Sequence, residues 1–188
     1  MINSLRHNQS KSLTPGTVFE KKWGPLTSDM IKEYAKSTGT DYPIHTNDLI
    51  ARILGLKGII AHGLLSCGVI TDFLEHIMEG HELIDCDYQM RGVIRPGDIS
   101  TIKVMVKEIC DDRVKFEISQ LTKTKIALEK DGNIIRKYKA YRRNWITPKD
   151  KKKNLIKSEQ IDDVKLLYRL KTTILGNVEY RLNKRRMH

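Results

Sequence analysis

The sequence has few cysteines and no long apolar run. Its three cysteines in 188 residues are an odd number whose spacing fits neither a zinc site nor a disulfide framework, so we expect free thiols in a reducing, cytoplasmic compartment. The longest apolar stretches, such as GIIAHGLL, are far too short to span a bilayer. The opening residues MINSLRHNQSKSL lack the apolar core of a secretory signal. We therefore expect no disulfide scaffold, no membrane span, no secretory signal and no bound metal.

Negative charge is scarce toward the carboxyl end. The net charge is +11, and residues 148–188 hold twelve Lys or Arg against five Asp or Glu, which gives +7 there. Such a field attracts phosphate-bearing ligands, acidic carrier proteins, anionic membranes or nucleic acid. The chain has no helix-turn-helix pattern and no glycine- or aromatic-interleaved RNA-binding signature, so nucleic acid is the less favoured partner.

The remaining composition is typical of one globular domain with an extension. Hydrophobic residues make up 39% and charged residues 30% of the chain. We expect a flexible amino terminus over 1–15 and a folded domain over 16–146. The lysine-rich TPKDKKKN begins a basic linker and tail over 147–188. In that tail Ile161, Val164, Leu167 and Tyr168 recur at helical spacing, which predicts a carboxyl-terminal helix.

Helix signals dominate the first half of the domain and strand signals the second. Thr27 or Ser28 can cap a helix that ends at Gly39, and Asn47 or Thr46 can cap a second one. A long, mostly apolar helix is predicted over 59–79. After Gly80 the pattern alternates with a period of two, and turns at RPGD and Asp131-Gly132 separate four or five strands. This order predicts an α+β fold, with a curved antiparallel sheet around one long helix.

Two motifs lie close together on the helical half of the chain. PIH occupies residues 43–45 after YAKSTG at 34–39, and IAHGL occupies residues 60–64. Together, and with RGVIRPGD downstream, they resemble the MaoC-like family, the (R)-specific enoyl-thioester hydratases and 3-hydroxyacyl dehydratases. The resemblance covers roughly residues 16–145. It implies a hot-dog fold and a homodimer or heterodimer with active sites near the subunit contact. It also implies a substrate carried on coenzyme A or on the phosphopantetheine of an acyl carrier protein, with no other cofactor.

The resemblance also implies roles for individual residues. His45 matches the family histidine that holds the reacting water together with an aspartate. Gly63 matches the residue whose amide, at the start of the long helix, stabilises negative charge on the thioester oxygen. The sequence departs from the family at the aspartate, because Thr40 stands there and the acid follows at Asp41. Tyr42 replaces the usual asparagine.

Each of these residues also has a purely structural interpretation. Asp41 is either the displaced catalytic acid or a turn residue that bonds its own backbone, and Thr40 is either a turn hydroxyl or a ligand of the water. His62 is a thioester-site neighbour or a packed, backbone-bonded histidine. Thr71 is a site hydroxyl or a side chain that bonds the preceding helical turn. Asp98, in RPGD, is interpreted as a turn residue.

Three functions follow from these observations. The first is hydration or dehydration of an acyl thioester, which the paired motifs favour. The second is a non-catalytic or partner-dependent hot-dog subunit that binds the thioester, which the missing aspartate favours. The third, supported only by basic charge, is a regulator that senses acyl thioesters.

Overall fold

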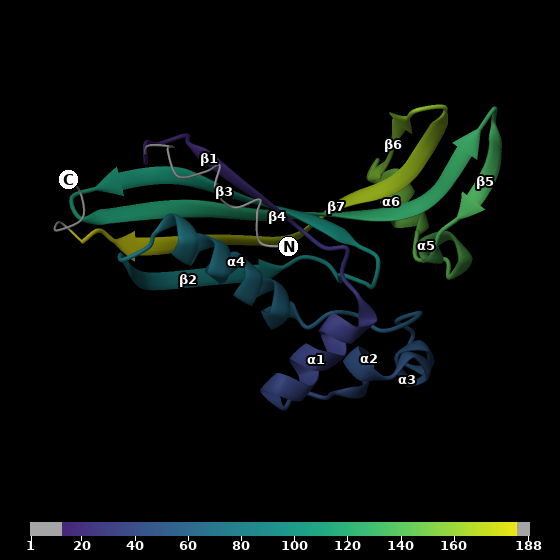
Figure 1. The fold of residues 1–188 in the computed structure, drawn as a ribbon, viewed down its shortest axis with the longest axis horizontal. Coiled ribbons are helices and arrows are strands. Elements are labelled where there is room, and N and C mark those ends of the chain that lie inside the picture. Colours follow the sequence, from purple (N-terminus) through teal and green to yellow (C-terminus); the bar gives the residue numbers. More distant parts are fainter. Residues whose placement is uncertain (1–12, 184–188) are drawn as a thin grey trace.

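The computed structural model describes residues 13–183 as one antiparallel sheet with helices at its sides and ends (Figure 1). The elements in chain order are β1 (Val18–Trp23), α1 (Ser28–Thr38), α2 (Pro43–Thr46), α3 (Asp48–Ile53), α4 (Gly63–Ile77), β2 (Glu82–Met90), β3 (Ile99–Cys110), β4 (Arg113–Lys130), β5 (Asn133–Lys137), α5 (Lys139–Arg142), α6 (Pro148–Lys152), β6 (Ile156–Ile161) and β7 (Val164–Arg181). Within this range no helix is long and apolar enough to cross a membrane.

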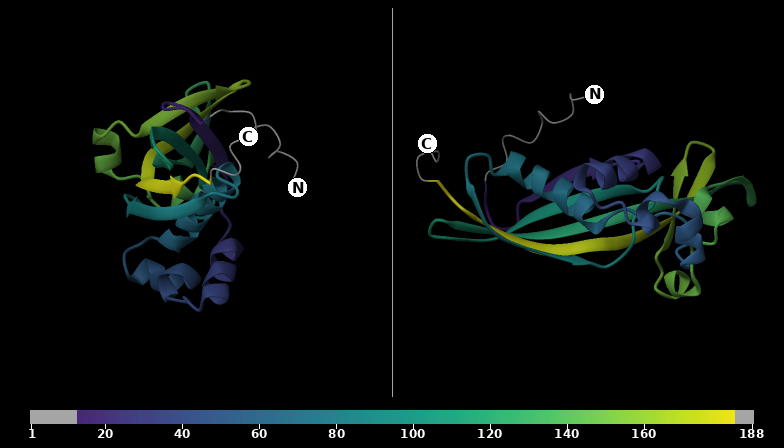
Figure 2. Two further views of the ribbon diagram at one scale, coloured as in Figure 1. Left: turned by 90° about the vertical axis from the view of Figure 1, so that its left-hand side faces the viewer. Right: turned by 90° about the horizontal axis from the view of Figure 1, so that it is seen from below.

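The sheet is built on two long strands, β4 and β7, of 18 residues each. Its main order is β1-β3-β4-β7-β2, with every pairing antiparallel. Two further strands pair with the long ones outside this main order: β5 pairs with β4, and β6 pairs with β7. The two views in Figure 2 show this ribbon running from the layer under α4 to a separate group formed by β5, β6, α5 and α6. The expected α+β class and antiparallel sheet are confirmed.

The helix expected over 59–79 is observed over Gly63–Ile77 and lies against the sheet. Its buried side chains meet alternate residues of the strands in one apolar core: Phe19, Cys67, Ile70, Phe73, Leu74, Met78, Ile102, Val104, Val106, Val114, Phe116, Ile118, Ile174, Val178, Tyr180 and Leu182. The preceding residues are extended because the amide of Ile60 donates to Ile44 O at 3.2 Å and that of Ala61 donates to Ile94 O at 2.8 Å. These two bonds fix where α4 begins.

The helices α1 and α3 form where local signals predict them, whereas the single turn of α2 at Pro43–Thr46 was not predicted. The Thr27 hydroxyl accepts from Met30 N, and Gly39 ends α1 at a φ of 66°. The Asn47 side chain accepts from the amides of Leu49 and Ile50 in the first turn of α3. A second apolar cluster holds these helices against the segments that flank α4: Leu26, Ile31, Ala51, Ile59, Ala61 and Ile94. The cluster thereby positions the two histidine motifs next to each other.

The predicted carboxyl-terminal helix is wrong, because residues 156–181 form the β6–β7 hairpin. Ile161 pairs with Val164 across a turn in which Asp162 has a φ of 50°. The helical spacing of apolar residues that suggested a helix is interrupted by this turn. β7 lies between β4 and β2 and buries Leu166, Ile174, Val178 and Tyr180. A boundary at residue 147 would therefore divide the sheet, because residues 156–161 and 164–181 are strands of it.

Most of the net positive charge lies in the segment from the end of β5 to the start of β6, through α5 and α6. Residues 136–157, which we term the basic segment, hold ten Lys or Arg and one acid, so they carry +9 of the total +11. The segment is fastened to the chain just before α4. Arg143 Nη1 lies 2.7 Å from Asp48 Oδ1, and Trp145 Nε1 donates to Lys57 O at 3.1 Å.

Asp98 lies in the turn that the sequence predicts, and it is also buried. Its Oδ2 accepts from Arg95 N at 2.9 Å, but its side chain is only 2% exposed. Burial raises the pKa of Asp98 to about 6, although hydrogen bonds from Thr124 and Arg95 and the nearby Arg169 act in the opposite direction. The RPGD sequence predicts that Asp98 lies in a turn, but it does not predict that its side chain is buried.

The raised pKa of Asp98 predicts that this residue contributes stability below pH 4 that is lost above pH 6. The folded state keeps a proton that the unfolded chain releases near pH 4, so the ionised carboxyl lowers the free energy of unfolding as pH rises through this window. A shift of about two pKa units corresponds to roughly 3 kcal/mol. Urea unfolding at pH 4 and pH 7 should show this change in the native protein and not in Asp98→Asn. Equal pH dependence in both proteins would contradict it.

Candidate active site

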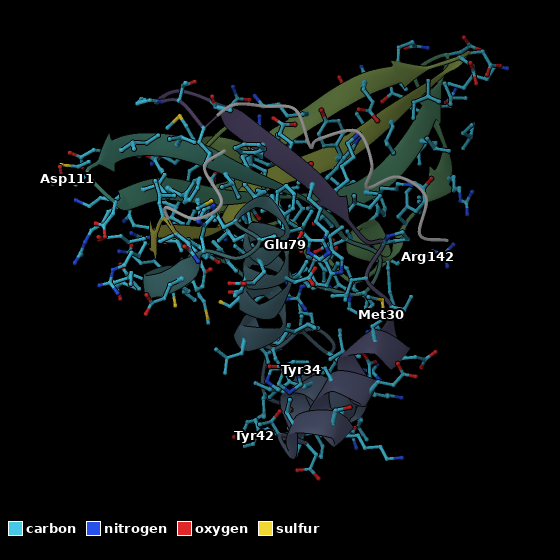
Figure 3. All side chains as sticks on the ribbon, turned by 60° about the vertical axis from the view of Figure 1, so that its left-hand side comes forward. Met30, Tyr34, Tyr42, Glu79, Asp111 and Arg142 are labelled. Atoms are coloured by element: carbon cyan, nitrogen blue, oxygen red, sulfur yellow. The ribbon has the colours of Figure 1, made fainter. Side chains whose placement is uncertain are left out.

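Two histidines from separate motifs stack on each other beside the start of α4. His45 lies on α2, and His62 is the residue immediately before α4. Their ring centroids are 3.7 Å apart and their planes differ by 28°. Tyr34 of α1 also packs against His62, with the two ring centroids 5.0 Å apart. Figure 3 shows Tyr34 close to the first turn of α4.

Backbone carbonyls fix the orientation and the tautomer of both rings. His45 Nδ1 lies 2.8 Å from Ile60 O, and His62 Nε2 lies 2.8 Å from Thr40 O. A carbonyl oxygen can only accept, so each of these nitrogens carries the proton. In the neutral rings, His45 Nε2 and His62 Nδ1 are then the free, basic nitrogens.

Burial favours the neutral form of His45. It lowers the pKa of His45, and the adjacent His62 lowers that pKa further, while the bond to Ile60 partly opposes both effects. The imidazole is therefore mainly neutral near pH 7. A neutral imidazole with one free nitrogen is suited to accept a proton from a bound water.

A cavity of about 430 Å³ opens beside the two rings. Its lining combines the residues around the start of α4 with the segment that follows β2: His45, Ile60, Ala61, His62, Gly63, Ser66, Met90, Arg91, Gly92, Val93, Ile94 and Ile174. Most of these side chains are apolar, and none is a carboxylate. The cavity can therefore accommodate an apolar group next to imidazole nitrogens and one arginine.

The first turn of α4 faces this cavity without a side-chain cap. His62 makes no capping hydrogen bond, so the amides that begin at Gly63 have no side-chain partner within the described part of the chain. Amides at a helix start attract negative charge through their direction and through the helix dipole. A Cβ at position 63 would overlap the Sδ of Met90, so any larger residue there would require this flexible, exposed side chain to move.

The other residues proposed from the sequence lie elsewhere. Asp41 is exposed and lines a different depression, between α1 and α2. Thr40 Oγ1 lies 2.6 Å from Thr38 Oγ1, and its carbonyl holds His62. Tyr42 is 62% exposed on the outer side of the helices (Figure 3). Thr71 lies 3.2 Å from the Tyr88 hydroxyl and does not line the cavity.

Ser66 and Arg91 line the cavity and were missed by sequence reasoning. Ser66 is 1% exposed and follows His62 by one helical turn, so this spacing was the available signal. Arg91 follows β2, whose strand pattern gives no indication of the cavity. Among residues 13–183 no group of three or more His, Cys, Asp or Glu side chains is placed to hold a metal ion.

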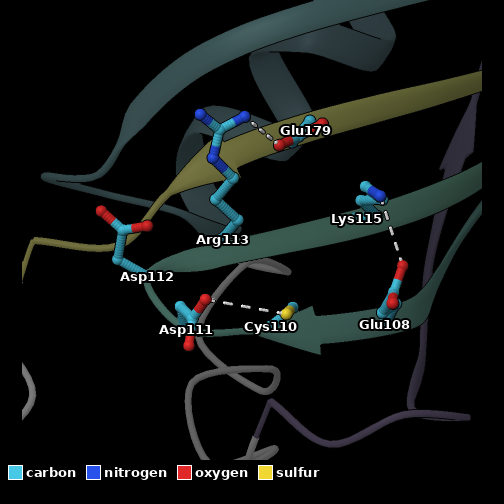
Figure 4. A pocket seen from close by; sticks show the side chains of 7 residues that line it. All are labelled: Glu108, Cys110, Asp111, Asp112, Arg113, Lys115 and Glu179. Carbon is cyan, nitrogen blue, oxygen red and sulfur yellow. Dashed lines mark hydrogen bonds and ion pairs between the residues drawn. The ribbon is translucent and has the colours of Figure 1, made fainter.

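A second depression, at the turn between β3 and β4, has no such arrangement (Figure 4). Arg113 pairs with Glu179 at 2.7 Å, and Lys115 pairs with Glu108 at 3.3 Å. These exposed charges neutralise one another, as surface ion pairs commonly do. We therefore place the candidate active site at the two histidines.

Comparison with known sequences identifies the family. Residues 9–131 match the MaoC like domain, which is more than half of the chain. The chain belongs to this family. The resemblance inferred from the two histidine motifs is thus confirmed, and the MaoC-like assignment covers both motifs and the sheet as far as the end of β4.

Solved structures share the fold of this MaoC-like chain at low sequence identity. The unliganded R-hydratase PhaJ1 from Pseudomonas aeruginosa matches with a TM-score of 0.61 and 16% identity, over 90% of this chain and 82% of the other. The ChsH1–ChsH2 complex from Mycobacterium tuberculosis matches with a TM-score of 0.60 and 11% identity, over 92% of this chain and 100% of the other. At these identities the likeness shows the hot-dog-like fold alone.

One curated relative is a much larger protein. The fatty acid synthase subunit beta of Aspergillus oryzae is 30% identical over 87 residues, which are 44% of this chain. The matched region spans only 4% of that subunit.

Proposed function

We propose that this MaoC-like chain is a hydro-lyase that adds water to a trans-2-enoyl thioester, or removes it from the 3-hydroxyacyl thioester. One observation carries the proposal: the free Nε2 of His45 and the uncapped start of α4 share one largely apolar cavity. A general base and an oxyanion site are the two groups that this reaction needs. The R-hydratase and the fatty acid synthase subunit among the relatives support the choice.

In the direction of hydration, His45 takes a proton from the water as the oxygen bonds to C3. The electron pair of the C2=C3 bond moves toward the thioester carbonyl, whose oxygen becomes negative. The Gly63 amide at the start of α4 stabilises that oxygen. The proton held by His45 then passes to C2, so one water supplies both the hydrogen and the hydroxyl. The proposal gives no chemical step to Asp41, Tyr42 or Thr71.

The basic segment suits the carrier of the acyl group. It has a net charge of +9 within 22 residues. Hydrogen bonds join it to Asp48 of α3 and to Lys57, which lies in the loop before α4. Coenzyme A brings phosphates and an acyl carrier protein brings acidic side chains, and a basic surface attracts both. We propose that the thioester arrives on one of these carriers.

A direct assay tests the activity and the carrier together. Purified protein should consume the enoyl absorbance of a short trans-2-enoyl thioester and yield the (R)-3-hydroxy product on chiral chromatography. The same acyl group is offered on coenzyme A and on acyl carrier protein, and each rate is measured at low and high salt, because salt weakens attraction between charges. No turnover on either carrier by the folded protein would refute the proposal.

The absence of a carboxylate from the cavity lining favours a second candidate, a subunit that needs a partner for catalysis. Large apolar side chains are exposed on the helical half of the domain and at the end of β2, which suits a subunit contact: Tyr42, Leu49, Ile53, Leu54, Leu64 and Met90. Of these, Met90 also lines the cavity. The ChsH1–ChsH2 relative is named as a complex of two proteins. Sedimentation of the purified chain would separate the two candidates, since an active homodimer excludes the need for a different partner.

A further inference from the structure

Five buried polar side-chain atoms in the described range have no hydrogen-bond partner: His62 Nδ1, Ser66 Oγ, Asp98 Oδ1, Gln120 Oε1 and Arg169 Nε. Two of the five, on His62 and Ser66, belong to residues that line the cavity beside His45. A buried polar atom without a partner is unfavourable, and such atoms are normally satisfied by a ligand or a bound water. The pair therefore indicates a position where a polar ligand atom belongs.

The two atoms come from the extended residue that precedes α4, His62, and from the first turn of that helix, Ser66. Both residues line the same cavity. Buried serines in helices commonly bond the carbonyl one turn earlier, but the Ser66 hydroxyl makes no such bond. It therefore stays available to donate into the cavity.

The chemistry of His62 is set by its surroundings. The protonated Nε2 donates a hydrogen bond to Thr40 O, so Nδ1 of the neutral ring is an acceptor. Stacking on His45 and contact with Tyr34 hold the ring in place. An acceptor and a hydroxyl donor in one cavity match a water or a hydroxyl group, which can donate to the first and accept from the second.

We propose that His62 Nδ1 and Ser66 Oγ bind the reacting oxygen, which is water in hydration and the 3-hydroxyl group in dehydration. The water gives one proton to His45 Nε2 and directs the other at His62 Nδ1. Its oxygen accepts from Ser66 and keeps one electron pair for C3. This inference rests on the proposed function, and it assigns to His62 and Ser66 the water-holding role that the family gives to an aspartate at the position of Thr40.

Ligand binding tests the site without requiring turnover. (R)-3-Hydroxybutyryl-CoA carries the hydroxyl, and butyryl-CoA is its matched control without it. One hydrogen bond corresponds to roughly a fivefold change in affinity. The hydroxylated thioester makes two such bonds, so it should bind at least about fivefold more tightly than butyryl-CoA by calorimetry, and Ser66→Ala, which removes one of the bonds, should reduce that preference by about fivefold. Nitrogen NMR of His62 should show an Nδ1 shift with the hydroxylated thioester only.

Kinetics and stability provide the second test. Ser66→Ala and His62→Gln should each lower kcat/KM by about tenfold to a hundredfold, while His76→Gln, an exposed histidine of the same helix, should leave it unchanged. The thermal midpoint of Ser66→Ala should not fall, because its hydroxyl makes no bond in the folded chain. Equal affinity for the two thioesters, or an unchanged Nδ1 signal, overturns the inference. Absence of enoyl turnover alone refutes the proposed reaction and leaves these binding results to decide the hydroxyl site.

Discussion

Replacing His45 by glutamine is expected to lower kcat/KM for enoyl-thioester hydration by about 10²–10⁴-fold. Glutamine keeps a polar side chain on α2 but has no nitrogen that accepts a proton near pH 7. Burial and the adjacent His62 lower the pKa of His45, so the native ring is neutral and basic at that pH. The measurement is the initial rate of loss of enoyl absorbance, with binding of butyryl-CoA measured in parallel to show that the cavity is intact.

Two further variants separate this expectation from its alternatives. Asp41→Asn should change the rate by no more than about twofold, because Asp41 is exposed and lines another depression. If Asp41→Asn abolished activity and His45→Gln did not, the proposed site would be wrong. A large gain in activity from Thr40→Asp would instead favour a subunit that has lost its own acid. His76→Gln again controls for the loss of a histidine.

A chain that ends at residue 163 is expected not to fold. β7 supplies both neighbours in the sheet with hydrogen bonds, since it pairs with β4 and with β2. The deleted residues also bury five large side chains in the described range: Leu166, Ile174, Val178 and Tyr180 of β7, and Leu182 just after it. At about 1.5–3 kcal/mol for each, their burial is comparable to the entire stability of an ordinary domain.

Circular dichroism and size-exclusion chromatography measure this directly. The truncated chain should lack a cooperative thermal transition and elute as an expanded or aggregated species. Asn177→Ser, an exposed substitution on the same strand, is the control and should keep the native transition. A cooperative transition in the truncated chain would show that residues 164–188 are a dispensable tail.

Local signals in the sequence were sufficient for the helical half of the domain. Thr27, Gly39 and Asn47 cap or end helices through contacts with residues only a few positions away. The start of α4 was predicted four residues too early, because it depends on bonds from Ile60 to Ile44 and from Ala61 to Ile94. Such contacts join distant segments, and apolar periodicity does not reveal them.

β7 shows the same limit more strongly. Its apolar residues near the β6–β7 turn happen to recur at helical spacing, and its partners β4 and β2 lie far away in the sequence. In the site, the two motifs predicted His45, His62 and Gly63, which do share a cavity. The direction of Asp41 and the burial of Ser66 could not be predicted, because both depend on how α1 and α4 meet their neighbours.

The position of β7 in the chain also has a consequence for biosynthesis. The strand follows every other described element, yet it lies between β4 and β2 in the sheet. While the ribosome is still making residues 164–182, β4 and β2 each present a row of unpaired backbone groups, and the apolar face of α4 is only partly covered. Strand pairings of such long sequence separation form slowly. The nascent chain is therefore most prone to aggregate until β7 has been made, and this is the stage at which a chaperone would protect it.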